Sequence, residues 1–159
     1  MNPITFLQIS VEDIFWSGLA AVGFAILFNV PRRLLLGCFL TGATGHLIRT
    51  ILAMSGSSLE FGTLAGAVAV GFLSVFLASR YDVPASLFAV TGAIPLVPGV
   101  FAYQTIVGLL NATAAPPDQS VELLATAAIN GIRTALILSA IAFGIAAPTL
   151  LFRRPNRIV

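Results

Sequence analysis

The chain has 159 residues, of which 58% are hydrophobic and 9% charged, and its mean hydropathy is +1.01. A soluble domain carries about 25% charged residues, so this composition excludes a soluble globule and places most of the chain in lipid. The basic residues are all Arg and too few to form a face that follows phosphates, which argues against nucleic-acid binding. A single His and a single Cys exclude an internal disulfide and a zinc cluster of His and Cys, and we expect no metal or cofactor.

Five apolar runs are long enough to cross a bilayer, since about 20 residues make one helical crossing. In chain order they cover residues 14–30, 34–54, 61–79, 84–110 and 121–152. The segment before the first run holds Glu12 and Asp13 and no basic side chain, unlike a secretory signal peptide, so we expect that run to be retained. We therefore predict an all-α membrane protein with about five transmembrane helices in a single domain over residues 1–159.

The second run contains His46 and, three residues later, Arg49 on the same helix face. A lone intramembrane His can relay protons because it titrates near neutral pH, or it can be a neutral side chain bonded to a hydroxyl. Arg49 is five residues from the end of the run, so its head group could instead extend to the outer interface. Both residues are candidates for a substrate path, with these alternatives open.

Pro95, Pro98 and Gly99 interrupt the fourth run at its centre. Each proline removes an amide donor, and open backbone at mid-bilayer is tolerated only where protein or a water-filled cavity satisfies it. Transporters use such broken helices to present the partially positive start of a half-helix to an anionic group. We predict a substrate-binding break here, with Tyr103 and Gln104 as hydrogen-bonding residues one turn later. The alternative is a proline kink that shapes helix packing.

The fifth run contains Arg133, roughly 16 Å along a helix from Glu122 at 1.5 Å per residue. Such an Arg costs about 2.5 to 3.5 kcal/mol and usually faces a bundle interior or a water-filled path. We predict that Arg133 grips a substrate carboxylate with Asn130 on the same face, the alternative being a structural Arg bonded to carbonyls or a partner helix. Because no run holds an interior carboxylate, we expect the counter-charges of Arg49 and Arg133 to come from an anionic ligand, another chain or lipid phosphate.

The charged residues between the runs predict the orientation, because basic loops are retained on the cytoplasmic side. The loop and terminal Arg residues all fall on one side of the membrane: Arg32, Arg33, Arg80, Arg153, Arg154 and Arg157. The other side holds acidic residues and no basic side chain: Glu12, Asp13, Glu60, Asp118 and Glu122. We therefore predict an N-terminus outside the cell and a C-terminus in the cytoplasm.

Three ordered segments resemble the threonine/serine exporter family: residues 21–31, residues 45–49 and residues 93–99, the last followed by Ala102 and Tyr103. The short chain and the pair Arg154 and Pro155 near its end look more closely like the small YjjB-type subunit of the split, two-component members. The resemblance implies export of small metabolites across the bacterial inner (plasma) membrane, threonine or serine for fused members and the dicarboxylate succinate for split pairs. It also implies a larger membrane subunit of the same family as partner.

These observations together predict one subunit of a secondary exporter of small carboxylates, working with a larger subunit in the lipid bilayer. A higher oligomer is left open. An enzyme is not expected, because one His and no interior carboxylate leave little acid–base chemistry. The alternative is a non-transporting assembly subunit that supports a transporting partner.

Overall fold

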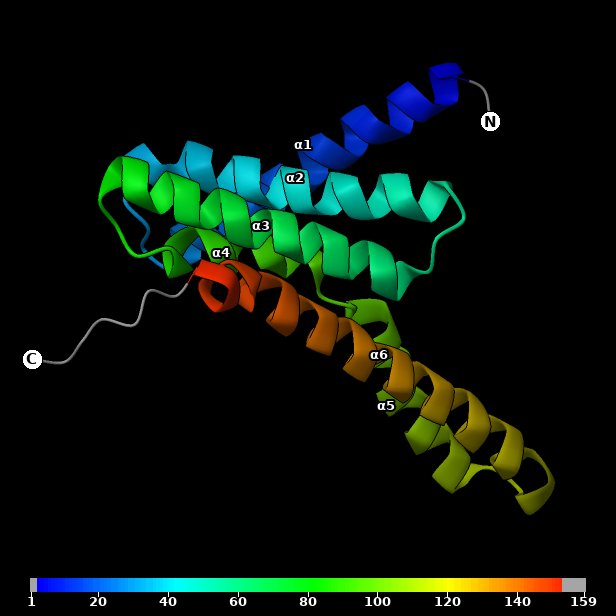
Figure 1. Ribbon diagram of the computed structural model, residues 1–159. Helices are drawn as coiled ribbons and strands as arrows, with labels where there is room; N and C mark the ends of the chain where they lie inside the picture. Colours follow the sequence, from blue (N-terminus) through cyan, green and yellow to red (C-terminus); the bar gives the residue numbers. More distant parts are fainter. Residues whose placement is uncertain (1–2, 153–159) are drawn as a thin grey trace, which may run out of the picture. The chain divides into compact units, whose positions relative to one another are not determined.

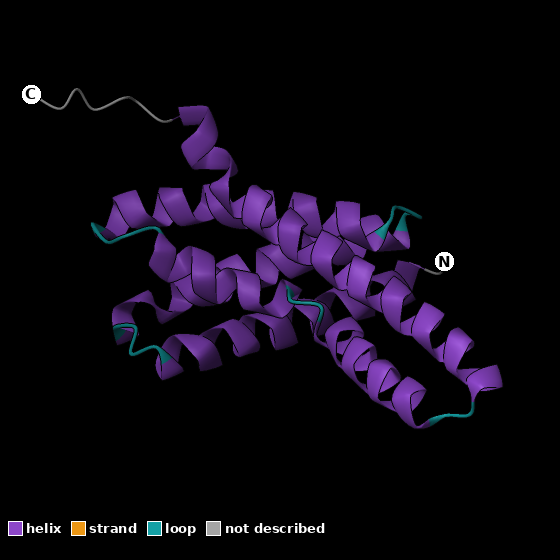
Figure 2. Ribbon diagram, turned by 90° about the horizontal axis from the view of Figure 1, so that it is seen from below, coloured by secondary structure: helices purple, strands orange, loops and turns teal. Residues whose placement is uncertain are grey.

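The computed structural model describes residues 3–152, which form helices joined by short turns and loops and include no strand (Figures 1 and 2). The all-α prediction is therefore confirmed. Four residues used above for the orientation and the resemblance lie outside the described residues: Arg153, Arg154, Pro155 and Arg157.

The helices are α1 (Pro3–Leu27), α2 (Leu35–Met54), α3 (Leu59–Tyr81), α4 (Ser86–Ala93), α5 (Gly99–Ala114) and α6 (Pro117–Phe152), with 3-10 turns η1 (Arg32–Leu34) and η2 (Ile94–Leu96). Within residues 3–152, four helices are long and apolar enough to cross a membrane. A fifth span is reached if α4 with η2 and α5, which form a bent pair, count as one. The predicted membrane protein with a broken fourth helix is confirmed.

Two helices extend beyond the apolar runs. α1 begins at Pro3, eleven residues before the first apolar run, and its polar residues Ser10, Asp13 and Ser17 recur at helical spacing on one face. Ser10 and Ser17 are 8% and 7% exposed, so this face packs against protein. α6 begins at Pro117, where proline suits the first turn of a helix because its missing amide has no intrahelical partner.

The chain forms two compact units. The first unit contains the chain up to Leu96 together with α6 from Ala140 onward, and the second unit is Val97–Ser139. The continuous helix α6 contributes to both units. That residues 1–159 form a single transmembrane domain stays a prediction.

In the first unit, α2 packs against α1, α3 and α4 (Figure 1). Close packing of α2 depends on small residues, because glycine lets two helix backbones approach. A Cβ atom at Gly66 on α3 would collide with the carbonyl oxygen of Gly45 on α2, and one at Gly42 would lie 3.1 Å from the carbonyl oxygen of Ser17 on α1. These contacts set how α1 and α3 align with α2.

Replacing Gly66 by Ala is expected to destabilise the protein, because the new methyl group meets backbone atoms that cannot rotate away. Overpacking of this kind costs about 1–3 kcal/mol, so the variant in detergent should unfold at a lower temperature than the parent. Gly23→Ala on α1 is the matched control, since a Cβ there meets nothing within 4 Å. Equal melting temperatures for the two variants would contradict the close approach of α2 and α3.

Candidate functional site

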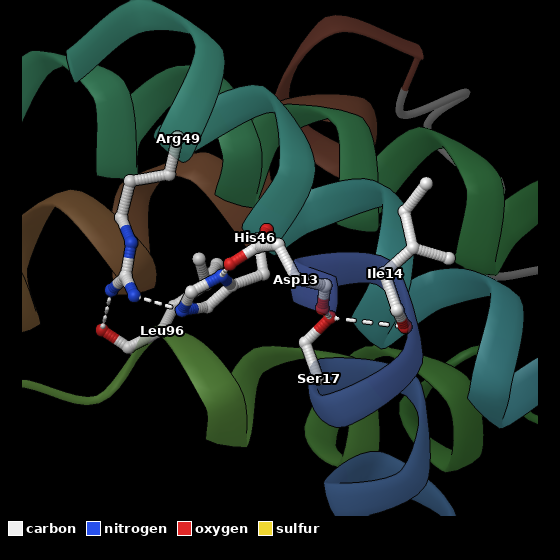
Figure 3. Close-up of polar contacts among 6 residues, drawn as sticks. All are labelled: Asp13, Ile14, Ser17, His46, Arg49 and Leu96. Atoms are coloured by element: carbon white, nitrogen blue, oxygen red, sulfur yellow. Dashed lines mark hydrogen bonds and ion pairs between the residues drawn. The ribbon is translucent and has the colours of Figure 1, made fainter. Parts of the chain in front are cut away.

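The packing of α1 on α2 brings three polar side chains together, Asp13, His46 and Arg49, which we call the polar cluster (Figure 3). Nδ1 of His46 lies 2.6 Å from Oδ1 of Asp13. Nη2 of Arg49 contacts Nε2 of the same imidazole ring, and Nη1 of Arg49 donates to the carbonyl oxygen of Leu96 at 3.1 Å. His46 therefore bridges a carboxylate and a guanidinium, and Arg49 connects both to the end of η2.

The contacts of the cluster fit a neutral imidazole, in which Nδ1–H donates to Asp13 and Nε2 accepts from Arg49. A protonated ring would instead turn its second N–H toward the N–H groups of Arg49, leaving two donors face to face. With His46 neutral, the negative charge of Asp13 balances the positive charge of Arg49. This balance lowers the free-energy cost of holding both charges inside a helix bundle.

One oxygen of the cluster lacks a partner. The side chains of His46 and Asp13 are 20% and 15% exposed, and Arg49 is also half-buried. Oδ2 of Asp13 is buried and has no hydrogen-bond partner among the described residues. The same is true of Oγ of Ser10, one helical turn earlier on the same face of α1. Two adjacent positions on this face thus have unused hydrogen-bonding capacity.

The break in the fourth helix supplies the acceptor for Arg49. In an unbroken helix, the carbonyl of Leu96 would accept from the amide of residue 100. Here η2 ends at Leu96 and α5 begins at Gly99, after Pro98, which has no amide hydrogen. The last carbonyls of a helix need partners from elsewhere, and Arg49 provides one.

The polar cluster corrects three expectations. Asp13 lies within the candidate span Ile4–Leu27, so a described span does hold a carboxylate. The counter-charge of Arg49 comes from the same chain, through His46, and Arg49 points to the helix break. His46 is bonded to a carboxylate, not to a hydroxyl. The helical spacing of Ser10, Asp13 and Ser17 was the available signal for Asp13.

Arg133 lies in the second unit, on α6, and is exposed. Its Cζ atom is 5.7 Å from the ring centroid of Phe101 on α5, within the range of a cation–π contact. The half-buried Asn130, one turn before, accepts a 2.8 Å hydrogen bond from Thr134 through its backbone carbonyl. No carboxylate forms an ion pair with Arg133 within residues 3–152. Its guanidinium therefore remains open to an anion.

The remaining predicted site residues lie around the helix break. Pro95 belongs to η2 and packs near Gly42 of α2, and Pro98 is buried directly before α5. Tyr103 and Gln104 are exposed on α5, and no hydrogen bond joins either to Arg133 within the described part of the chain. Their role in binding a substrate stays a prediction.

Comparison with known proteins places these features in a family context. Residues 13–151 match the family described as "Threonine/Serine exporter, ThrE". An uncharacterized protein of Haemophilus influenzae is 36% identical over 155 residues, which cover 97% of this chain and 51% of that protein. The chain thus spans about half the length of this relative. No solved structure matches the chain.

Proposed function

Because this chain belongs to the threonine/serine exporter family, we propose that it lines the transport path for small carboxylates as one membrane subunit of a secondary exporter. The observation that carries the proposal is the position of Arg49, half-buried beside a broken helix and held there by two neutral acceptors. Family membership also implies transport and not catalysis as the role of the chain.

Arg49 is suited to exchange its present partners for a substrate. A planar guanidinium binds a carboxylate through two parallel hydrogen bonds, which are about twice as strong as bonds between neutral groups. Arg49 now bonds an imidazole nitrogen and the carbonyl of Leu96, both neutral. A substrate carboxylate can displace these acceptors, and the carbonyl of Leu96 then loses its hydrogen bond to α2. Binding would in this way act directly on the segment where the helix is interrupted.

Two guanidinium groups support the proposed substrate class. Threonine, serine and succinate each carry a carboxylate that Arg49 can bind. Arg133 is the second group, since it has an aromatic neighbour but no ion pair within residues 3–152. A chain that offers two guanidinium groups for anions favours a dicarboxylate such as succinate over a zwitterionic amino acid as the substrate class.

We further propose that a larger membrane subunit of the same family completes the exporter in the bacterial inner membrane. The support is membership of the threonine/serine exporter family, whose split members divide the exporter between two chains. The alternative is a non-transporting assembly subunit that supports a transporting partner. Cells that express this chain together with its co-purifying membrane protein should export succinate or threonine faster than cells that express either alone. Undiminished export without this chain would contradict both roles, whereas full export by an Arg49 variant that still assembles with the partner would support the assembly role.

The proposed orientation has an external N-terminus and a cytoplasmic C-terminus, because the loop charges are sided. Reporter fusions after Arg33, at the start of α2, should read cytoplasmic, and fusions after Pro116, between α5 and α6, should read external. Between the two fusion points lie α2, α3 and the broken pair of α4 and α5, which make three crossings if the pair counts as one span. If both reporters read the same compartment, this number of crossings is wrong.

A further inference from the structure

Two adjoining pockets lie in the first unit, where α1 ends and α2 begins. The larger has a volume of about 460 Å³ and is lined by Ile26, Asn29, Val30, Pro31, Arg32 and Leu35. The smaller has a volume of about 200 Å³ and is lined by Phe28, Val30, Ser86, Leu87, Val90 and Thr91. Because Val30 lines both, the two pockets lie next to each other, and together they connect the end of α1 with the start of α4.

A backbone turn at the end of α1 fixes the position of Asn29 in the larger pocket. The amide of Val30 donates to the carbonyl of Ala25 at 2.9 Å, and the amide of Asn29 donates to the carbonyl of Ile26 at 3.0 Å. This pair of bonds is typical of a helix end at which one residue turns left-handed, and Asn29 does so with a φ of 56°. Asparagine accepts this conformation more readily than most residues other than glycine. The turn therefore holds the Asn29 side chain in one place.

Arg32 gives the larger pocket a positive charge. It is exposed, and no carboxylate forms an ion pair with it within residues 3–152. The ends of α2, α3 and α4 meet here in one apolar cluster, so Arg33 and Arg80 add positive charge to this end of the unit and Asp82 adds one negative charge. An Arg guanidinium binds a phosphate group through two parallel hydrogen bonds, and the Asn29 amide can donate another. The larger pocket thus suits a phosphate.

The smaller pocket suits a hydrocarbon chain. Phe28 and Val90 in its lining are each 51% exposed, and the hydroxyl of Thr91 is already bonded to the carbonyl of Leu87 at 2.9 Å. The pockets lie between the candidate spans that end at Leu27 and begin at Arg32, which is the level at which headgroups meet the hydrocarbon core. A free phosphate would leave the apolar pocket empty, whereas a phospholipid fills both.

We propose that the two pockets form a binding site for one anionic phospholipid, which we call the lipid site. Arg32 and Asn29 bind its phosphate, and the first part of one acyl chain lies in the smaller pocket, between the end of α1 and the start of α4. Basic pockets between membrane helices on the cytoplasmic side are typical sites for anionic headgroups, and the proposed orientation puts this end of the unit there. The lipid site goes beyond the proposed function and does not depend on it, because it includes no residue of the polar cluster.

Native mass spectrometry tests the headgroup part of the lipid site. The full chain, purified in mild detergent and freed of lipid, is titrated with phosphatidylglycerol or with phosphatidylcholine that has the same acyl chains. The first phosphatidylglycerol should bind about five- to tenfold more tightly than the first phosphatidylcholine, and Arg32→Gln should remove most of this preference. Arg33→Gln is the matched control, since it removes the same charge from the adjacent residue, which lines neither pocket, and it should keep the preference.

Two further variants separate the parts of the lipid site. Asn29→Gly keeps the left-handed turn and removes only the side-chain amide, so it should lower the affinity for phosphatidylglycerol by about threefold. Val90→Trp fills the smaller pocket and should weaken binding while the lipid-free protein melts as the parent does. Binding of both phospholipids with equal affinity, or equal losses in Arg32→Gln and Arg33→Gln, would overturn the inference. Competition by an equal concentration of glycerol 3-phosphate, which has no acyl chain, would show a phosphate site and overturn the assignment to a lipid.

Photolabelling locates the lipid without a variant. A phosphatidylglycerol with a photoreactive diazirine near the start of one acyl chain is added at one molecule per protein, and the labelled peptides are identified. Label should appear at Phe28 and within residues 86–91, which line the smaller pocket. Label found mainly on α5 or α6 would contradict the lipid site. Neither readout requires transport, so the lipid site can fail while the proposed function holds, and the reverse.

Discussion

Replacing Asp13 by Ala should lower the free energy of unfolding by about 3–5 kcal/mol, because it leaves the half-buried Arg49 without a balancing charge. The loss exceeds the value of the His46 hydrogen bond itself, since an uncompensated charge inside a bundle is the larger cost. The measurement is reversible unfolding in mixed micelles, followed by circular dichroism.

A double variant separates charge balance from other effects of the Asp13 substitution. Asp13→Ala combined with Arg49→Met removes both charges, and should recover much of the stability that Asp13→Ala loses. Glu12→Ala is the control for position, because Glu12 is adjacent on α1 but exposed, and it should change stability by no more than about 0.5 kcal/mol. Equal losses for Glu12→Ala and Asp13→Ala, or an additive loss in the double variant, would show that the cluster is not a balanced ion network.

Replacing Pro95 and Pro98 together by Ala should reduce transport at least about tenfold while leaving membrane insertion near normal. Alanine restores the missing amide donors and favours a continuous helix by about 3 kcal/mol per replaced interior proline. The carbonyl of Leu96 would then accept from the amide of Val100, and Arg49 would lose its acceptor at the break. Uptake of labelled substrate into proteoliposomes measures the effect, with the amount of folded protein set equal by size-exclusion chromatography.

Pro84→Ala is the matched control for the double proline variant, since Pro84 lies in the connection between α3 and α4 and not at the break. It should transport normally. Full transport by the double variant would show that the prolines only shape helix packing and would contradict the proposed role of the break in binding.

The membrane spans and the break could be predicted because both depend on local properties of the chain. Apolar length alone separates lipid-spanning helices from loops, and two prolines with a glycine interrupt a helix wherever they stand. The start of α1 could not be predicted in this way. Ser10 and Asp13 look like part of an extramembrane segment unless the face that they share with Ser17 is known to pack against protein.

The polar cluster could be predicted only in part. His46 and Arg49 share a helix face, which follows from their spacing along the chain. Their contact with Asp13 depends instead on how far α1 is shifted along α2, and this alignment is set by close contacts such as that of Gly42 with the backbone of Ser17. The hydrogen bond from Arg49 goes to the backbone carbonyl of Leu96, which every residue type has. The sequence therefore does not indicate this bond, and only the three-dimensional structure shows it.

Substrate counterflow in proteoliposomes tests most directly whether the transport site lies at Arg49. The purified complex is loaded with unlabelled succinate or threonine, and accumulation of the same labelled compound is followed for the wild type, Arg49→Gln and Arg33→Gln. Arg33 lies exposed in η1 and serves as the control for loss of one positive charge. We predict that wild type and Arg33→Gln accumulate label and that Arg49→Gln falls to the level of protein-free liposomes. Accumulation by Arg49→Gln equal to that of the wild type would contradict the proposed site.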